Sequence, residues 1–573
     1  MKVSFNWLRE FVDLNISNEE LTKLLPLRTI GVKEVTQDFV ELDMKGYNRA
    51  DLLSLRGVAY EVAAITGSKL KFIEIDISGD KIMLEHKDIL EFRTKVEDPQ
   101  RAPLYTLVKI EGLRVGKSTE SWIKKLKDSG IRSINNIADV TNLVMVEYGQ
   151  PMHAFDGDKI DEEIVVRIAN KGERIKTLDG KERVLSSEDL LITDPQRAVG
   201  IAGVMGGENS EVTDSTTTIF LEAAIFDSQT IRKTSTRLGL VSEASKRFVH
   251  GLTQRRLFQA LDAAIKMYED LGGKLKAITM EGTTFDPIKR IPLTLEKVRS
   301  LIGVEISPKD TENYLKKLNF KLQRRGVNVN HPEGVIDNWE IIPPYFRLDI
   351  EIEEDVVEEV ARMYGYEKIP SQELKGSLPS KIDQTQFELI SKLKKTLVDL
   401  GLTEVQTYSF YSTDVLRNLG WMDHLDKLIK VANPISSETE FLRQNIWSNL
   451  LEVAAKNSKR GFRDIVIFEV GKIYWINQEG EYNEKYSLAI LLVNNTDNPI
   501  QELYNIFQGV KLSHLRGVSM LKMDRQANFH PTRFAFLQKN DKTTGFLAEL
   551  HPRVVNKFGV EQRVAALEID INL

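Results

Sequence analysis

The chain is too long to fold around a single hydrophobic core. It has 573 residues, whereas single cores stop growing at about 250–300 residues and longer chains divide into domains. Its hydrophobic fraction of 42% and charged fraction of 28% are those of ordinary globular proteins, so each domain can bury a core of its own. We therefore predict about four domains.

Composition and charge exclude several classes of protein. The chain has no cysteine, which excludes disulfides, thiolate metal sites and cysteine nucleophiles and fits a reducing cytosol. Charged residues interrupt the apolar residues of the first segment, at Arg9, Glu10 and Asp13, so we do not expect a secretory signal. The longest clean apolar run, Leu488 to Val493, is too short to span a bilayer. With a net charge of −6, nucleic-acid binding would depend on local basic patches.

Capping residues, glycines and hydrophobic periodicity predict the elements of the first half. Ser17 and Glu20 form a capping box before a short helix, whose apolar stripe consists of Leu21, Leu24 and Leu25. Further helices are predicted over residues 52–66, ended by Gly67, and over 255–271, ended by Gly272-Gly273. Between residues 105 and 222, turn signals such as Asp179-Gly180 and Gly206-Gly207 predict short strands.

The second half of the chain is predicted to begin with a linker over residues 287–292. A small α+β domain follows, with elements over 295–302, 311–318 and 339–342. A helix is then predicted over 387–400, with strands over 464–475, 487–493 and 564–573. In the last strand, apolar residues alternate with polar ones, which predicts a half-buried strand; they are Leu567, Ile569, Ile571 and Leu573.

An acidic run is the clearest physical signal. From Asp349 to Glu359, seven of eleven residues are acidic. If Asp355 begins a helix, Glu358 and Glu359 lie on the same face as Asp355, and the opposite, buried face consists of Val356, Val357, Val360 and Ala361. Hard oxygen ligands suit Mg²⁺. The residues alone favour a solvated helix face with a Glu358–Arg362 pair, because charge runs are usually surface.

The other candidate motifs leave the function undecided. The glycine-rich stretch Gly200–Gly207 lacks the ending of a phosphate-binding loop and the spacing of a dinucleotide fingerprint, so it predicts close packing. His153 is expected in an exposed turn, and a lone histidine is more often structural than catalytic. No spacing singles out a covalent or zinc mechanism. The basic stretch Lys456–Arg463 could meet RNA phosphates, but a surface loop is favoured.

Several long segments resemble the β subunit of bacterial-type phenylalanyl-tRNA synthetases. They follow the order of that family from the first residue to the last, which makes the resemblance highly specific. The segments are RSINNIADVTN at 132–142, GQPMHAFD at 149–156, SEASKRF at 242–248, RLDI at 347–350, EEVARMYGY at 358–366, NPIS at 433–436, IFEVG at 467–471 and ELHP at 549–552.

The resemblance implies an α+β multidomain fold. It implies mixed α/β modules at residues 1–90 (N-terminal) and 91–285 (editing), a small winged α+β domain at 286–372 carrying the acidic segment, and an inactive core with a class II synthetase-like antiparallel sheet at 373–573. It also implies a cytoplasmic (αβ)₂ heterotetramer without membrane association. In that assembly the α subunit binds ATP and phenylalanine and charges tRNA(Phe), while the β subunit is a scaffold.

The resemblance also implies roles for individual residues. Glu222 is expected to receive the hydroxyl of tyrosine that was wrongly attached to tRNA(Phe). The remaining pocket residues are His153, Thr141 and Asn142, the close-packed floor Ala202 and Gly206, and Ser242 where relatives usually have threonine. A site that pairs its polar groups with this hydroxyl can discriminate by roughly 10⁴-fold. The family's magnesium positions fall on Asp349, Asp355, Glu358 and Glu359, so the resemblance favours a Mg²⁺ site over the solvated face.

Two familiar parts of the family have no counterpart in this sequence. Gly31–Val35 runs almost directly into Phe39–Asp43, which leaves no room for the usual tRNA-binding OB-fold, and Leu573 stands where the anticodon-binding domain would begin. We therefore expect tRNA recognition through the acceptor end and the partner subunit. Two alternatives are a free-standing deacylase of mischarged tRNA, which would not need the core, and a non-enzymatic paralogue, which would not need Glu222 and His153.

Overall fold

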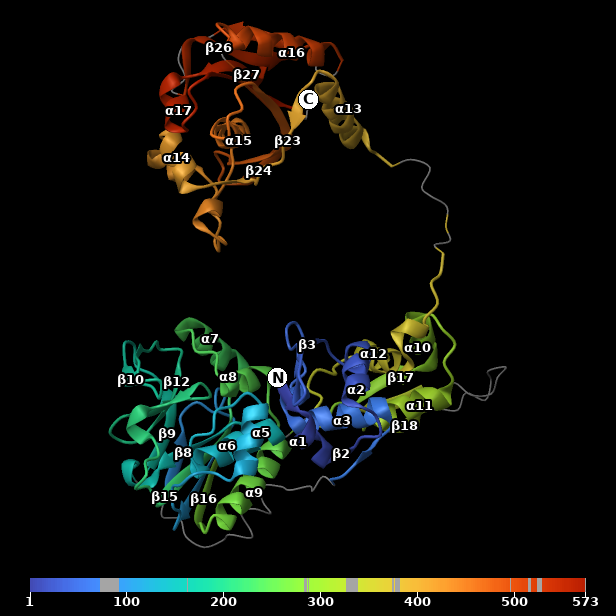
Figure 1. Ribbon diagram of the computed structural model, residues 1–573, viewed down its shortest axis with the longest axis vertical. Helices are drawn as coiled ribbons and strands as arrows, with labels where there is room; N and C mark the ends of the chain where they lie inside the picture. The colour runs from blue at the N-terminus through green and yellow to red at the C-terminus, as the bar shows by residue number, and fades with distance from the viewer. Residues whose placement is uncertain are drawn as a thin grey trace. The chain divides into compact units, whose positions relative to one another are not determined.

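The computed structural model divides into two compact units, Met1–Glu373 and Leu374–Leu573, both of which combine helices with largely antiparallel sheets (Figure 1). This confirms the mixed α+β class, while the division into four domains stays a prediction. The structure describes residues 1–72, 92–161, 163–282, 286, 288–325, 338–373, 376, 382–494, 496–513, 517–522 and 528–571.

The chain begins with a small sheet covered by helices. The predicted capping box is confirmed, because Ser17 Oγ accepts the Glu20 N–H at 3.2 Å and the Glu20 carboxylate accepts the Ser17 N–H at 2.9 Å. The second predicted helix is interrupted at Ser54, which caps its main part, and it ends at Gly67 as predicted. The elements are β1 (Lys2–Ser4), α1 (Phe5–Phe11), β2 (Val12–Asp13), α2 (Asn18–Arg28), β3 (Val32–Val35), β4 (Phe39–Leu42), a 3₁₀ turn (Asp51–Leu53), α3 (Leu55–Thr66) and β5 (Lys69–Leu70).

Two sheets form the next part of this unit. The four-stranded sheet has the order β16 (Lys274–Gly282), β7 (Leu104–Glu111), β15 (Thr218–Ile225), β8 (Met152–Asp156). The five-stranded sheet has the order β14 (Met205–Gly206), β13 (Ala198–Ile201), β12 (Leu190–Thr193), β9 (Glu163–Ile168), β6 (Arg93–Val96). One apolar cluster joins residues of both sheets. A second cluster lies between the four-stranded sheet and the helices α6 (Asn136–Tyr148) and α9 (Gln254–Asp270).

Helices account for part of the region in which we predicted only short strands. α5 (Glu120–Asp128) and α6 lie between β7 and β8, with side-chain caps at Thr119 and Asn135. α6 is buried on most sides, so it has no clear polar face by which the sequence could have indicated a helix. The predicted Asp179-Gly180 turn joins β10 (Arg174–Lys176) to β11 (Glu182–Val184), and two further helices follow β15, α7 (Ser228–Leu238) and α8 (Glu243–His250).

The last part of the first unit contains the helices and the strand that we predicted for a small α+β domain, while its standing as a separate domain stays a prediction. Its antiparallel sheet has the order β17 (Ile291–Thr294), β19 (Asn338–Ile342), β18 (Lys321–Arg325), and its helices are α10 (Leu295–Ile302), α11 (Pro308–Lys317) and α12 (Glu353–Tyr364). The predicted linker was wrong at its end, because Ile291 and Pro292 belong to β17. Pro287 lies outside the described residues.

A seven-stranded sheet organises the second unit. Its order is β20 (Thr403–Glu404), β23 (Ile465–Ile476), β24 (Tyr482–Asn494), β28 (Arg563–Asp570), β27 (Lys542–Leu550), β26 (Phe529–Lys539), β25 (Ser519–Lys522). The remaining α-helices and strands are α13 (Thr385–Asp399), β21 (Phe410–Tyr411), α14 (Thr413–Leu419), β22 (Phe441–Leu442), α15 (Trp447–Ser458), α16 (Pro499–Ser513) and α17 (Pro552–Lys557).

The prediction of a half-buried final strand was wrong. β28 lies inside the sheet, and apolar clusters cover both of its faces. Even its polar residue Glu568 is buried. The alternation of residue types is therefore real, but it does not separate core from solvent in a central strand with two covered faces. Leu573 lies outside the described residues.

Candidate functional site

Glu222 and His153 meet in the four-stranded sheet. They are paired directly across β15 and β8, so their side chains point to the same face. Glu222 is buried, and the exposed turn predicted for His153 was wrong, because the residue lies within β8 and its Nε2 is buried. Neither Glu222 Oε2 nor His153 Nε2 has a hydrogen-bond partner. Buried polar atoms of this kind are rare and indicate a place for a ligand or water.

Burial makes both side chains neutral near pH 7. It raises the pKa of Glu222 to about 8 and lowers the pKa of His153 to about 4, because a buried group without a counter-charge loses the solvation of its charged form. A protonated carboxyl donates one hydrogen bond and a neutral imidazole offers an acceptor as well as a donor. The pair therefore suits a neutral hydroxyl group better than an ion.

The glycine-rich stretch packs against this pair. A Cβ at Gly206 would lie 2.6 Å from His153 Nε2, and one at Gly203 would lie 3.0 Å from the ring of Phe248. The prediction of close packing is thus confirmed. Ala202 is buried in the same apolar cluster. Any side chain at Gly206 would collide with the tip of His153, so glycine is required there for the ring to keep its position.

The remaining predicted pocket residues lie on other elements. Ser242 caps α8 and its hydroxyl donates to the Val204 carbonyl oxygen at 2.9 Å, which ties this helix to the glycine-rich stretch. Thr141 and Asn142 lie in α6, and the Thr141 hydroxyl donates within that helix to the Ala138 carbonyl oxygen at 2.8 Å. The described hydrogen bonds of Thr141 and Asn142 do not reach Glu222, so their place in the pocket stays a prediction.

Sequence reasoning missed Tyr105. It lies on β7 opposite Ala224 of β15, on the same face as Glu222. The residue is fully buried and its hydroxyl has no partner. Burial, and then the charge of Glu222, raises the pKa of Tyr105 above its ordinary value. No motif singles this residue out, and only the pairing of β7 with β15 places it here.

The acidic segment is organised by an arginine. Arg347 donates to both oxygens of Asp349, at 2.9 and 2.8 Å, and to both oxygens of Glu359, at 2.6 and 2.8 Å. Arg362 also donates to Glu359, at 2.9 Å. Burial alone would raise the pKa of Glu359, but the two arginine charges outweigh it and hold the pKa well below its ordinary value. The predicted Glu358–Arg362 pair was wrong, because Arg362 pairs with Glu359 and Glu61.

In this arrangement the four predicted magnesium ligands do not gather at one point. Asp355 Oδ2 accepts two backbone N–H groups at the start of α12, from Glu351 and Ile352. Glu358 is exposed while its neighbour Glu359 is buried, so the two carboxylates do not share a face with Asp355 as predicted. Among the described residues, no three acidic or histidine side chains gather as metal ligands would. The Mg²⁺ site stays a prediction, and Arg347 already supplies positive charge there.

The same charges join the acidic segment to the N-terminal part of the chain. Glu61 of α3 accepts from Arg362 at 2.8 Å and from Arg49 at 2.6 Å. Arg49 also donates to Asp51, at 2.9 and 2.7 Å. Every member of this network has a partner, which is the condition under which buried charges are tolerated. The network consists of Arg49, Asp51, Glu61, Arg347, Asp349, Glu359 and Arg362.

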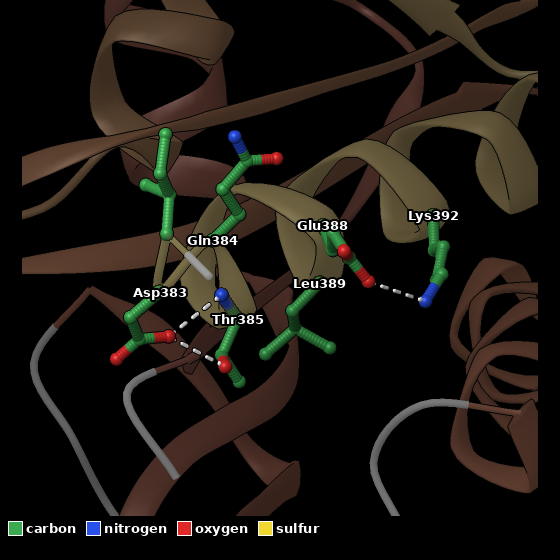
Figure 2. Close-up of a pocket in the computed structure, with 7 residues that line it drawn as sticks. Asp383, Gln384, Thr385, Glu388, Leu389 and Lys392 are labelled. Atoms are coloured by element: carbon green, nitrogen blue, oxygen red, sulfur yellow. Dashed lines mark hydrogen bonds and ion pairs between the residues drawn. The ribbon is translucent and has the colours of Figure 1, made fainter. Parts of the chain in front are cut away.

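A surface hollow of about 510 Å³ lies in the second unit at the start of α13 (Figure 2). Asp383 accepts from the backbone N–H and hydroxyl of Thr385 there, and Glu388 pairs with Lys392. These side chains are exposed, and the hollow contains no predicted site residue. It is the surface of a helix start and offers no buried group for chemistry.

Three family models match the chain in sequence order. They are described as the B3/4 domain, over residues 101–273, the tRNA synthetase B5 domain, over 291–366, and the phenylalanyl tRNA synthetase beta chain CLM domain, over 369–571. The Glu222–His153 pair falls in the first range and the acidic segment in the second. These matches place the chain in the class of tRNA synthetase proteins.

Proteins named phenylalanine–tRNA ligase beta subunit are similar over nearly the whole chain. The protein of Syntrophus aciditrophicus is 35% identical over 92% of this chain and 66% of its own length. The protein of Lactococcus lactis is 34% identical over 94% and 67%, and that of Carboxydothermus hydrogenoformans is 32% identical over 95% and 68%. The chain belongs to the phenylalanyl-tRNA synthetase β-subunit family. It spans about two thirds of the length of these relatives.

A solved N-terminal fragment of the phenylalanyl-tRNA synthetase β-subunit from Pyrococcus horikoshii covers 64% of this chain and 99% of that fragment, at 18% identity and a TM-score of 0.35. That likeness is too low to add to the description of the fold. Within the part of the chain that the structure describes, no helix is long and apolar enough to cross a membrane.

Proposed function

We propose that this chain is the β subunit of a phenylalanine–tRNA ligase and that it removes tyrosine wrongly attached to tRNA(Phe). The observation that carries the editing role is the Glu222–His153 pair. These residues are adjacent across two strands, and each has a buried polar atom without a partner. Family membership supports the rest of the proposal.

The pair selects tyrosine because it requires a hydroxyl. The protonated carboxyl of Glu222 donates a hydrogen bond to the phenol oxygen, and the neutral ring of His153 accepts a hydrogen bond from the phenol O–H. Phenylalanine would leave both groups buried and unpaired, which costs about 1–3 kcal/mol for each group. Correctly charged tRNA is thereby rejected, since a site built for a hydroxyl strongly disfavours the analogue that lacks it.

Hydrolysis of the ester proceeds without a protein nucleophile. The described residues around Glu222 and His153 contain no serine–histidine or comparable pair at hydrogen-bond distance that would activate one. An oriented water therefore attacks the ester carbonyl, and the terminal ribose hydroxyl of the tRNA assists. The protein contributes by holding the tyrosine ring so that the ester is placed for attack.

The second unit acts as a scaffold for the catalytic α subunit, which binds ATP and phenylalanine in an (αβ)₂ assembly. Buried charged groups in the sheet of the second unit form hydrogen bonds or ion pairs within that unit. Arg443 donates to Glu469 at 2.8 Å, and Glu568 accepts the backbone N–H groups at the start of α15. Groups paired in this way are not free for substrate, which supports a structural role.

Two experiments test this proposal. Co-expression with the α subunit of the same source should give a complex that attaches phenylalanine to tRNA(Phe), whereas neither chain alone does so. The complex should also hydrolyse preformed Tyr-tRNA(Phe), and Glu222→Ala should abolish this activity. Glu211→Ala, an exposed carboxylate of the same region, is the matched control. Unchanged hydrolysis by Glu222→Ala would refute the editing assignment.

A further inference from the structure

Unpartnered polar atoms gather around one short stretch of β15. Besides Glu222 Oε2 and His153 Nε2, the Tyr105 hydroxyl and Gln150 Oε1 are buried without a hydrogen-bond partner. Tyr105 is paired with Ala224, two residues from Glu222, and the Gln150 amide donates to the Ala224 carbonyl oxygen at 2.9 Å. Four such atoms in one place exceed what a native core usually leaves unpaired.

We propose that Tyr105 is a positioning residue of this site, and the proposal rests on the editing function proposed above. When a tyrosine side chain enters, the Tyr105 hydroxyl donates a hydrogen bond to the Glu222 carboxyl. That bond holds one carboxyl oxygen in place, so that the other is aimed at the phenol of the substrate.

Packing alone gives no reason for this hydroxyl. Tyr105 is fully buried in an apolar cluster, where phenylalanine would fill the same space without an unpaired polar atom. Another buried tyrosine of the same region, Tyr268, uses its hydroxyl to bond the Ile137 carbonyl oxygen at 2.9 Å. The hydroxyl of Tyr105 is therefore explained by a hydrogen bond to the Glu222 carboxyl that forms when the substrate is bound.

Tyr105 is also the suitable donor among the groups around Glu222. The oxygen of Gln150 only accepts, and His153 Nε2 donates only in one tautomer. Burial and the charge of Glu222 raise the pKa of Tyr105, so its hydroxyl keeps its proton. Among the described residues, the titratable groups that strand pairing places beside Glu222 on the same face are His153 from β8 and Tyr105 from β7. β14 contributes Met205 and Gly206, and the rest of the cluster on this face is apolar.

The test is hydrolysis of preformed Tyr-tRNA(Phe) by the full chain in complex with the α subunit, with Tyr105→Phe compared with wild type. We expect the rate to fall about five- to tenfold, as for loss of a hydrogen bond between two uncharged groups. Because the hydroxyl favours the ionised carboxyl, its loss should also move the alkaline midpoint of the pH–rate profile upward. The melting temperature should stay unchanged or rise, since an unpaired buried group is removed.

Tyr268→Phe is the matched control, because it removes a buried tyrosine hydroxyl of the same region that has a partner within the protein. It should lower the melting temperature and leave the pH–rate midpoint in place. A Tyr105→Phe rate within twofold of wild type, or a lower rate with an unmoved midpoint, would overturn the proposal for Tyr105 alone. If the wild-type complex itself fails to hydrolyse Tyr-tRNA(Phe), the proposed function fails instead.

Discussion

Glu222 of β15 and His153 of β8 are direct neighbours across the sheet, and each is held neutral by burial. Neither the glutamate oxygen Oε2 nor the histidine nitrogen Nε2 has a partner in the protein. Such a pair costs stability in the absence of a ligand, and proteins commonly keep this kind of cost at functional sites. Its energetic consequences can be measured without any activity assay.

The first prediction concerns the pH dependence of stability. Burial raises the pKa of Glu222 from 4.5 to about 8, so the folded chain keeps a proton that the unfolded chain has lost. The stabilisation from this group is complete below pH 4.5 and is lost as the pH rises to about 8. Glu222→Gln should therefore be more stable to urea than wild type at pH 9, with a free energy of unfolding higher by on the order of 5 kcal/mol. The difference should shrink towards pH 4.

The second prediction concerns the space in front of His153. Gly206→Ala would place a Cβ 2.6 Å from His153 Nε2, closer than such atoms approach, so the ring must shift and hydrolysis of Tyr-tRNA(Phe) should fall at least tenfold. Gly200→Ala is the control in the adjacent strand, because its Cβ meets its nearest neighbours at 3.7 Å. Equal rates for the two variants, measured on the same preformed Tyr-tRNA(Phe), would contradict the placement of the pocket at Gly206.

The third prediction separates two adjacent carboxylates of α12. Glu359→Ala leaves Arg347 and Arg362 buried without their shared partner, and removing one member of a buried ion network costs about 3–5 kcal/mol. Glu358→Ala removes an exposed side chain and should cost less than about 0.5 kcal/mol. Urea denaturation of both variants measures the difference. Similar losses would mean that the two carboxylates share one environment after all.

The fourth prediction concerns the second unit. Glu568 accepts the backbone N–H groups of Ile446 and Trp447 at 2.9 and 3.0 Å, which fixes the start of α15 to β28. Glu568→Ala leaves both groups unpaired and should destabilise this unit by about 2–4 kcal/mol. Glu561→Ala, at a carboxylate exposed near the same strand, should change little. Hydrogen exchange of α15 amides should be faster only in the Glu568 variant.

Sequence patterns predicted best those elements whose ends are set by local chemistry. The capping box at Ser17 and Glu20 was correct because both partners lie within one turn of helix. Both ends of α9 and both ends of β23 lie within one residue of their predicted positions. α6 was missed, since a helix packed on several sides lacks a polar face to reveal its period. α5 was missed although it has an exposed polar face and a side-chain cap at Thr119.

In the acidic segment, the spacing of residues along one helix did not predict which carboxylates are buried. The spacing of Asp355, Glu358 and Glu359 is correct for a shared face, yet Glu359 is buried and Glu358 is exposed. The difference comes from Arg347, Arg362 and Glu61, of which Glu61 lies about three hundred residues earlier in the chain. An ionised carboxylate is buried only where a positively charged group lies beside it, because its desolvation without a counter-charge is too costly.

The sequence by itself determined the family, the capping box at Ser17 and Glu20, the ends of several helices and strands, and the candidate residues Glu222 and His153. Each of these depends on residues that are close together in the sequence, through helix-capping pairs, hydrophobic spacing or a run of residues that matches the family. Only the tertiary structure decided that Glu222 and His153 face each other, that Tyr105 lies beside them and that arginines surround Glu359. Strand pairing and burial bring together residues that are far apart in the chain. The charge of each such residue then depends on how much of its surrounding water is lost.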